Sequence, residues 1–373
     1  MTAVSNDTDI DYTMALGKEV AIAEVDKELR LLWEKDKAST NASLINLAVY
    51  SERNGAIIQN SELVQAITRE HACRALLIGI DRDNPKASIR AWITAHCHLS
   101  QGRKSICCEQ IAFQLTGKST GRLRNTVFAH LNSDLPLVFW WQGELSPIFS
   151  DRLYSLIDRF VFDSSQWADP LPSFRCLEQA MDEASRFLPM DLEWTRSSQI
   201  RLAVAGLFDD PMAANALEHM NRIRIVVHTD HRIAGLQLLA WVIQRTGWQR
   251  SMELGLNAEH GDDFYFETNE GVDLTVTVQT DPSSAPLALI EFQSPECEVR
   301  VTREAGSPYL HQELSAGIHQ IDRCTPANSD DSAELVMNQL SKGGKNTLYR
   351  EMMPAFFELL GSEEDSPGLM SIR

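Results

Sequence analysis

The chain has 373 residues, of which 43% are hydrophobic and 23% charged, proportions typical of a soluble globular protein with two or three domains. Acidic residues outnumber basic ones by 52 to 34, which gives a net charge of -18 at pH 7. A field of this sign repels phosphate backbones and anionic membranes. The composition therefore argues against nucleic-acid-binding and membrane-surface proteins.

Membrane and secretory signals are missing from this sequence. No apolar run approaches the ~20 residues that a membrane-spanning helix needs, and the opening MTAVSNDTDIDYT is polar and acidic where a signal peptide is basic and then apolar. The seven cysteines are odd in number and irregularly spaced, which argues against a secreted disulfide framework and favours thiols that stay mostly reduced. We therefore expect a cytoplasmic protein.

The first half of the chain alternates predicted strands with predicted helices. Residues 1–38 are expected to form an extension that ends in an amphipathic helix, with Val25 and Leu29 on its apolar side. The predicted strands are 41–50, 73–80, 89–98 and 105–115, and the predicted helices are 61–67, 121–130 and 174–187. The last two of these strands flank a turn at 100–103 and predict an antiparallel hairpin.

Residues 135–162 predict a strand, a helix and a second strand. The run LPLVFWW at 135–141 is too short for an independent helix and too apolar for a strand with one wet face, so it predicts a strand covered on both faces. A helical pattern and a strand at 160–162 complete the unit, whose crossover is expected to be right-handed. Trp140 and Trp141 end the first strand, where open sheets present what they bind. Because buried aromatic residues are commoner than binding ones, a core position is the favoured interpretation for both indoles, and a surface role is the alternative.

The second half begins after a predicted boundary at 189–196. Its predicted helices are 200–208, 212–220, 234–243, 332–340 and 347–360. Its predicted strands are 224–228, 263–268, 272–279, 288–293 and 297–302. The last four strands alternate apolar and polar residues, and they predict an antiparallel meander with one solvated face.

These elements predict a mixed α/β and α+β fold class. We expect an N-terminal layered α/β domain with a mixed sheet over 39–190 and a C-terminal α+β domain with an antiparallel meander over 197–361. The extension at 1–38 precedes them, and an acidic, disordered tail at 362–373 follows them.

The segment AFQLTGKS at 112–119 matches a relaxed phosphate-loop pattern, with Gly117, Lys118 and Ser119 in the expected order. A phosphate cradle needs glycine-rich backbone that is not extended, whereas this segment continues a predicted strand. A plain turn followed by a helix start is therefore the favoured interpretation. The alternative is an enzyme that binds a phosphometabolite or a nucleotide through this turn.

His228, Asp230 and His231 follow a predicted strand, where metal ligands often gather. No third and fourth ligand can be identified, and Thr229 or Asp230 is also a natural helix N-cap. Capping is the favoured interpretation, so we expect no metal site and no cofactor.

Three cysteines lie in the predicted hairpin. Cys107 and Cys108 are neighbours in a strand and point to opposite faces, so they cannot both bind one ion without distortion. One of them could pair with Cys97 or with Cys73 across the sheet if the spacing permits, but buried inert thiols are the favoured interpretation. The catalytic patterns GxSxG, GxGxxG and paired CxxC are absent from the sequence, which weakens an enzyme interpretation.

Several segments taken together resemble the glucose-6-phosphate dehydrogenase assembly protein family OpcA, in its cyanobacterial branch. The segments are RALLIGI at 74–80, WITAHCHLS from 92, ICCEQI at 106–111, LPLVFWWQGEL from 135, DRFVFDSS from 158, IAGLQLLAWVIQRTGW from 233 and the tail GGKNTLYREMMP. The resemblance implies a non-catalytic partner that binds glucose-6-phosphate dehydrogenase, favours its active oligomer and raises its activity. In the cyanobacterial branch it also implies redox control through thioredoxin.

The resemblance suggests residues for each role but no catalytic residue. The expected redox residues are Cys97, Cys107 and Cys108, while Cys297 and Cys324 could pair in the second domain. The expected docking residues are Arg103, Lys104, Trp140 and Trp141, with a solvated turn as the alternative for the basic pair. Neither nucleic acid nor membrane is expected as a partner.

Overall fold

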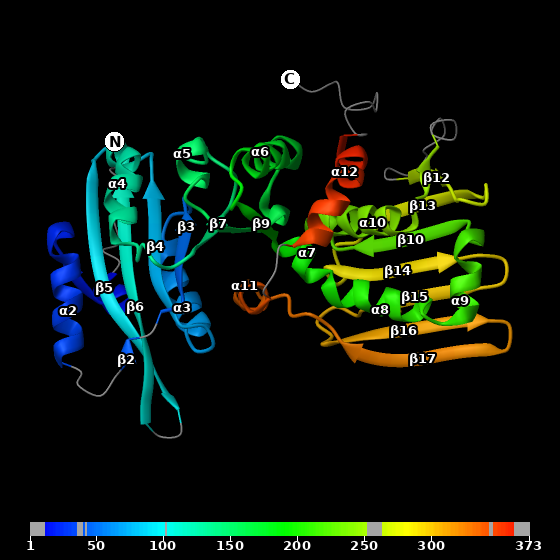
Figure 1. The fold of residues 1–373 in the computed structure, drawn as a ribbon, viewed down its shortest axis with the longest axis horizontal. Coiled ribbons are helices and arrows are strands. Elements are labelled where there is room, and N and C mark those ends of the chain that lie inside the picture. The colour runs from blue at the N-terminus through cyan, green and yellow to red at the C-terminus, as the bar shows by residue number, and fades with distance from the viewer. Residues whose placement is uncertain are drawn as a thin grey trace, which may run out of the picture. The chain divides into compact units, whose positions relative to one another are not determined.

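The computed structural model describes residues 12–35, 40–41, 43–100, 103–251, 263–342 and 346–361. The chain forms two compact units, unit 1 from residues 1–162 and 177–189, and unit 2 from residues 163–176 and 190–373. Helices and strands build both units, which confirms the predicted mixed α/β fold class (Figure 1). Among the described residues, no helix is both long enough and apolar enough to cross a membrane.

Unit 1 is built on a mixed sheet. In sheet order its strands are β1 (Lys18–Val20), β5 (Ser88–Ser100), β6 (Arg103–Thr116), β4 (Cys73–Asp81), β3 (Ile45–Ser51), β7 (Leu137–Gln142), β8 (Arg159–Phe162) and β9 (Leu188–Asp191), while β2 (Thr40–Asn41) pairs with β6. The strands β6, β4, β3, β7 and β8 are parallel, and β5 and β1 add an antiparallel edge. The chain builds outward from β3 to β4 and β6, then returns to β7 beside β3. The strand order therefore reverses between β3 and β7, as in doubly wound folds.

Helices cover both faces of this sheet. The helices of unit 1 are α1 (Tyr12–Leu16), α2 (Val25–Lys35), α3 (Ala56–Ile67), α4 (Leu123–Val127) and α5 (Asp151–Tyr154), and α6 (Pro170–Glu183) is shared between the units. Trp33 of α2 bonds Glu109 of β6, whereas Ser61 of α3 bonds the next residue, Gln110. Because neighbouring strand residues point to opposite faces, α2 and α3 lie on opposite sides of the sheet.

The predicted strand at 135–141 is confirmed as β7, which begins at Leu137 and is buried from there to Trp141. Its aromatic side chains join a cluster in which Trp141 lies 4.1 Å from Tyr50 and 6.2 Å from Phe160 between ring centroids. The predicted strand at 160–162 is also confirmed, as β8, parallel to β7. The helix predicted between them is reduced to the four residues of α5. Similarly, the predicted helix at 121–130 is a succession of the 3₁₀ helix η2 (Gly117–Arg122), α4 and the 3₁₀ helix η3 (Phe128–His130).

Unit 2 contains a second mixed sheet. In order its strands are β11 (Gln249–Arg250), β12 (Asp263–Glu267), β13 (Asp273–Thr280), β10 (Arg222–Val227), β14 (Leu287–Gln293), β15 (Glu298–Thr302), β16 (Tyr309–Ala316) and β17 (His319–Pro326). The predicted antiparallel meander is right for the pair β12 and β13 and for the pair β14 and β15. It is wrong where β10 inserts between β13 and β14, because β10 runs parallel to β13. The hairpin of β16 and β17 was not predicted.

Helices cover one face of the sheet in unit 2. Its helices are α7 (Leu192–Arg196), α8 (Ser198–Phe208), α9 (Pro211–Ala216), α10 (Arg232–Thr246), α11 (Ser332–Ser341) and α12 (Thr347–Gly361). Gly235 lets α10 approach closely, since a Cβ there would meet Val227 of β10 at 3.1 Å. On the other face, Glu291 pairs with Arg224 at 3.4 Å and with Arg300 at 2.6 Å. This face thus carries a ladder of ion pairs in place of a helical layer.

Candidate functional site

The hairpin of β5 and β6 extends beyond the rest of its sheet. The two strands are 13 and 14 residues long, but β4 pairs with β6 only from Gln110 onward. The part of the hairpin before that point, residues 97–107, is called the hairpin arm here. Beside β5, only the two-residue strand β2 pairs with it among the described residues. Figure 1 shows this end of the hairpin projecting below the other strands of unit 1.

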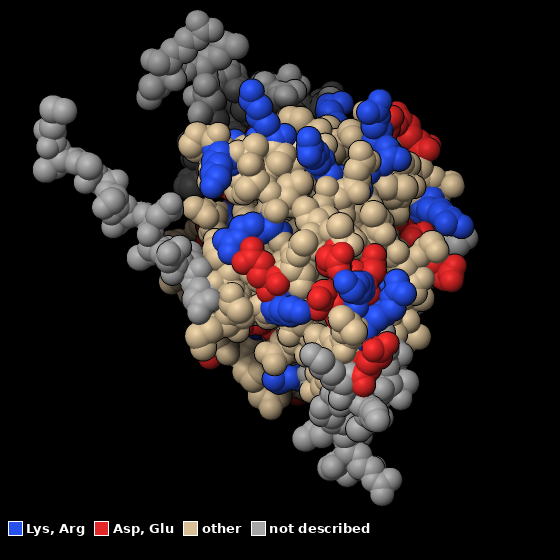
Figure 2. Space-filling model, turned by 90° about the vertical axis from the view of Figure 1, so that its left-hand side faces the viewer, with Lys and Arg blue, Asp and Glu red and all other residues tan. Residues whose placement is uncertain are grey.

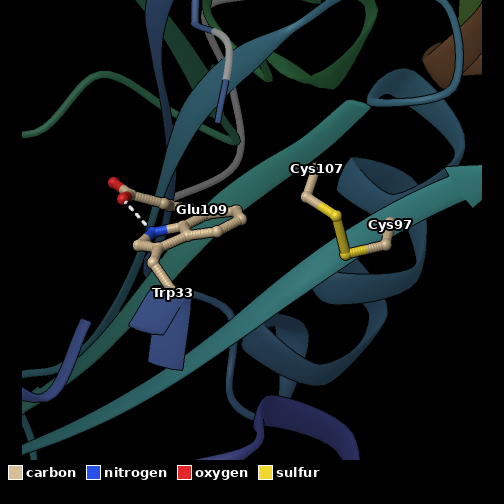
Figure 3. The surroundings of a disulfide bond; sticks show 4 residues. All are labelled: Trp33, Cys97, Cys107 and Glu109. Carbon is tan, nitrogen blue, oxygen red and sulfur yellow. Dashed lines mark hydrogen bonds between the residues drawn. A yellow bond between two sulfur atoms is a disulfide. The ribbon is translucent and has the colours of Figure 1, made fainter. Parts of the chain in front are cut away.

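A disulfide between Cys97 and Cys107 closes the base of the hairpin arm (Figure 3). The two residues lie directly opposite each other on β5 and β6, with Cα atoms 4.1 Å apart. The expectation that the thiols are mostly reduced is therefore wrong for this pair. Of the two partners that the sequence left open, the strand register selects Cys97. Cys107 is fully buried, whereas Cys97 is half-buried.

A buried carboxylate on the same face of β6 fastens a helix beside the disulfide. Glu109 is 6% exposed and accepts a hydrogen bond from the indole Nε1 of Trp33 at 2.6 Å (Figure 3). Its other oxygen lies 3.4 Å from the guanidinium of Arg74, which also pairs with Asp26 of α2. A buried carboxylate is tolerated only with such partners, because an unpaired charge costs several kcal/mol. The base of the arm is thus held between α2 and the sheet.

The opposite face of the hairpin carries the third predicted redox residue, Cys108. Its thiol is buried and hydrogen-bonded to that of Cys73, which lowers the pKa of Cys108 and raises the pKa of Cys73. Next to it, His96 bonds Gln110 at 2.9 Å, and burial lowers the pKa of this imidazole. Cys108 therefore lies on the face of β6 opposite the disulfide, with its thiol closed off from solvent.

An ion pair occupies the edge of unit 1 where the strand order reverses. Glu52 follows β3 and forms a two-pronged pair with Arg82, with distances of 2.7 and 2.8 Å. Tyr50 donates a hydrogen bond to the same carboxylate at 2.5 Å. Burial raises the pKa of Glu52, but the bonds from Arg82 and its neighbours outweigh this, so the pKa is lowered and the group is ionised. Doubly wound sheets bind phosphate-bearing cofactors at this edge, where the chain instead places a carboxylate.

The phosphate-loop candidate is a capped turn. The Ser119 hydroxyl accepts a hydrogen bond from the Thr116 amide at 3.2 Å and lies 2.6 Å from the backbone oxygen of Ser88, so the turn already uses it. Gly117 has φ +53°, and a Cβ there would meet the backbone oxygen of Asn84 at 2.6 Å. These contacts support the interpretation as a turn and a helix start, with Lys118 exposed.

The histidine cluster also forms a cap. His228 Nδ1 accepts a hydrogen bond from the Asp230 amide at 3.1 Å, so the capping residue is His228 itself and not Thr229 or Asp230. His231 instead pairs with Glu193 at 2.9 Å. Over the described residues, no three His, Cys, Asp or Glu side chains are grouped as a metal site would require.

Comparison with known proteins gives two family matches that follow one another along the chain. Residues 64–179 match the model described as the N-terminal domain of the glucose-6-phosphate dehydrogenase subunit. Residues 189–353 match the model described as the C-terminal domain of that same subunit.

The chain belongs to the OpcA family.

Neither match distinguishes the cyanobacterial branch, which stays a prediction. No curated protein matches the sequence.

Solved structures resemble the chain only remotely. The 3-ketoreductase KijD10 from Actinomadura kijaniata, in complex with NADP, is 9% identical, with 85% of this chain and 96% of that chain covered and a TM-score of 0.47. The WlbA dehydrogenase from Bordetella pertussis is 12% identical, with 87% and 97% covered and a TM-score of 0.47. An aldose-aldose oxidoreductase from Caulobacter crescentus is 11% identical, with 86% and 98% covered and a TM-score of 0.44. Likenesses this remote say nothing about the activity of an OpcA-family chain.

The docking residues expected from the resemblance lie in different environments. Trp140 and Trp141 are 3% and 1% exposed, and the Trp141 indole donates to the backbone oxygen of Glu144 at 2.9 Å. In this conformation neither indole is available to a partner, and their burial fits a core role. Arg103 and Lys104 begin β6 at the end of the hairpin arm, but their side chains lie outside the described residues.

The cysteine pair expected in the second domain is wrong. Cys297 is buried immediately before β15, whereas Cys324 is exposed on β17 and aligned with His311 of β16. Both are free thiols.

Sequence reasoning missed a buried carboxylate network in unit 2. Asp191 is fully buried and accepts hydrogen bonds from Ser164 Oγ at 2.7 Å and from Gln237 Nε2 at 2.6 Å. Burial raises the pKa of Asp191 to about 7, with Glu193 nearby adding to the shift. Arg196, 5% exposed, lies 3.4 Å from Glu193 and 3.7 Å from Asp163. The residues come from separate segments, so no local sequence pattern could have revealed the network.

Proposed function

We propose that this chain is a non-catalytic assembly factor that binds glucose-6-phosphate dehydrogenase and favours its active oligomer. The observation that carries the proposal is the pair of family matches, which cover residues 64–179 and 189–353 and are both described as domains of a glucose-6-phosphate dehydrogenase subunit. The Glu52–Arg82 ion pair gives no support to a phosphate-bearing cofactor at the reversal of the sheet, because a carboxylate occupies that position. The capped turn at Gly117 likewise gives no support to the phosphometabolite enzyme.

Activation by such a protein follows from its differential affinity. If the chain binds one oligomer or conformation of the dehydrogenase more tightly than another, it shifts the population toward the one it prefers. A coupling free energy of about 1 to 3 kcal/mol changes substrate affinity roughly 5- to 150-fold. No group of this chain needs to touch the reacting atoms.

The hairpin arm is the docking element in this proposal. It projects beyond the other strands of unit 1, and Arg103 and Lys104 begin β6 at its end. These are two adjacent cations in a chain of net charge -18, so they are suited to a partner surface that carries carboxylates. Trp140 and Trp141 of β7 are buried in the core and are not part of this docking element.

Thiol redox control completes the proposal. A dithiol reductant of the thioredoxin class attacks the Cys97 sulfur, releases the Cys107 thiolate and then resolves the mixed disulfide, leaving two cysteine thiols here and a disulfide in the reductant. Cutting this bond removes the covalent link between the two strands at the base of the arm. The arm then gains freedom, and its affinity for the dehydrogenase changes.

Binding to the dehydrogenase tests the docking element. Purified chain and dehydrogenase should co-elute on size exclusion, and the substitutions Arg103→Glu and Lys104→Glu should weaken the complex. Lys86→Glu provides the matched control, because Lys86 is an exposed cation in the loop before β5, at the end of the strand away from the arm. Loss of binding in the control to the same extent would count against a specific role for the arm. Failure of the unmodified chain to co-elute with the dehydrogenase would contradict the proposed assembly function itself.

A further inference from the structure

Unit 1 has a cavity of about 290 Å³ between the segments that follow β6 and β7. Thr120 to Phe128 supply one wall and Pro147 to Leu153 the other. Both walls lie at the carboxyl ends of parallel strands, the edge at which sheets of this kind present their ligand sites. The cavity lies apart from the disulfide, which is at the opposite end of β6.

Two guanidinium groups line this cavity, one from each wall. Arg124 belongs to α4 and Arg152 to α5, and both side chains are exposed. Neither forms a side-chain hydrogen bond or an ion pair with any described residue, and no carboxylate lines the cavity within the described part of the chain. Asp151, next to Arg152 in sequence, is not part of the lining. The chain has a net charge of -18, so a pocket lined by two arginines and no carboxylate differs in charge from the average surface of the protein.

The remaining lining combines an apolar floor with short polar side chains. Leu123 and Leu153 are each 5% exposed, and Phe128 stacks edge-on against Phe139 of β7 at 6.3 Å between centroids. The lining also includes three neutral polar residues, namely Thr120, Asn125 and Ser150. Small-molecule sites have this composition, with apolar walls and a few polar groups that fix orientation.

Lys and Arg side chains are frequent, beside a few acidic ones, on the drawn surface at the same end of unit 1. The carboxyl ends of the parallel strands point upward in Figure 1, and Figure 2 keeps that direction. In Figure 2, Lys and Arg side chains gather toward the upper part of the face, whereas both signs of charge mix at its centre.

We propose that this cavity binds a small organic phosphate, with Arg124 and Arg152 clamping the phosphate group and the apolar floor contacting the organic part. A guanidinium presents paired N–H donors that match phosphate oxygens. A phosphomonoester carries about -1.5 to -2 charges at pH 7, which two guanidinium groups neutralise, whereas a carboxylate would leave one of them uncompensated. The cavity lies at the lower end of the ~300 to 1,000 Å³ range of ligand pockets, so the ligand is small. This inference goes beyond the proposed assembly function and does not depend on it.

Isothermal titration calorimetry on the full chain tests the site without the dehydrogenase. Phenyl phosphate serves as the probe for phosphate plus apolar group, inorganic phosphate for the anion alone and benzoate for a carboxylate. We expect phenyl phosphate to bind at one site and more tightly than either of the others. Arg124→Gln and Arg152→Gln should each weaken it roughly 10- to 100-fold, as expected for the loss of a charged hydrogen-bond donor. Both residues are exposed, so the variants should fold as the parent does.

Arg122→Gln is the matched control, because Arg122 is an exposed arginine of the preceding 3₁₀ helix that does not line the cavity. Its binding of phenyl phosphate should equal that of the parent. Three results would overturn the proposal: no saturable binding at millimolar phenyl phosphate, equal affinity for benzoate, or an equal loss of affinity in the Arg122 control. The last of these would reveal diffuse electrostatic attraction in place of a site.

Discussion

Reduction of the Cys97–Cys107 disulfide should destabilise unit 1. The bond joins residues separated by 10 positions. Constraining a loop of this length in the unfolded chain stabilises the folded state by about 2 to 3 kcal/mol. The cost is concentrated where β6 has only β5 and the short β2 as neighbours among the described strands, so the hairpin arm should loosen before the rest of the sheet.

Urea unfolding followed by tryptophan fluorescence measures this effect, in oxidised protein and in protein opened by dithiothreitol. The double substitution Cys97→Ala and Cys107→Ala is the control, since it should unfold like the reduced parent and ignore the reductant. Thiol titration confirms that the bond has opened. An unchanged unfolding midpoint in protein whose disulfide is demonstrably reduced would refute the reasoning.

Three further predictions concern stability. Asn46 is 1% exposed, and its side chain forms three hydrogen bonds with the backbone of the loop before β7. Asn46→Ala should therefore lower the free energy of unfolding by about 2 to 4 kcal/mol, measured by chemical denaturation. A loss below about 1 kcal/mol would contradict the role of this loop contact. Gly117→Ala should cost about 1 to 3 kcal/mol, because φ is positive and the new Cβ would meet the backbone oxygen of Asn84. Gly121→Ala should leave stability unchanged, because a Cβ at this position meets open space. Equal losses of stability in the two variants would rule out backbone strain at Gly117 as the cause. Burial raises the pKa of Asp191 to about 7, above an unfolded value of about 4, so the contribution of this one group to stability should be fully present below pH ~4 and fall by up to about 4 kcal/mol as the pH rises to ~7. Asp191→Asn should reduce the dependence of stability on pH between ~4 and ~7. An unchanged pH slope in this variant would contradict the raised pKa of Asp191.

Burial patterns along single segments predicted much of the fold. The uninterrupted apolar run that forms β7 indicates a strand buried on both faces. The alternation of buried and more exposed residues in β13 indicates a strand with one buried face. Such signals are local, because each residue's own polarity records whether it faces the core.

Elements that depend on distant neighbours escaped prediction. β17 has no regular buried row, since it lies at the edge of its sheet and pairs only with β16 among the described strands. β10 takes its place between β13 and β14 through partners that are remote in sequence, such as Thr275 and Gln293 opposite Arg222. The excursion of residues 163–176 into unit 2 is likewise a matter of contacts that no local pattern records.

The candidate site was predicted in part for the same reason. Sequence reasoning placed Cys97 and Cys107 in one hairpin but could not fix the register that pairs them. It could not tell the buried Trp140 and Trp141 from surface aromatics, because both environments favour an indole at a strand end. The cations of the pocket, Arg124 and Arg152, are 28 positions apart and only the fold brings them together.

The kinetics of glucose-6-phosphate dehydrogenase with and without this chain test the central claim most directly. The assay is run on protein with the disulfide intact and on protein with it reduced. The proposal predicts no turnover by this chain alone, a Michaelis constant of the dehydrogenase lowered about 5- to 150-fold in its presence, and a different effect in the two redox states. A Michaelis constant that is the same with and without the chain in both redox states, or turnover by the chain without the dehydrogenase, would contradict it.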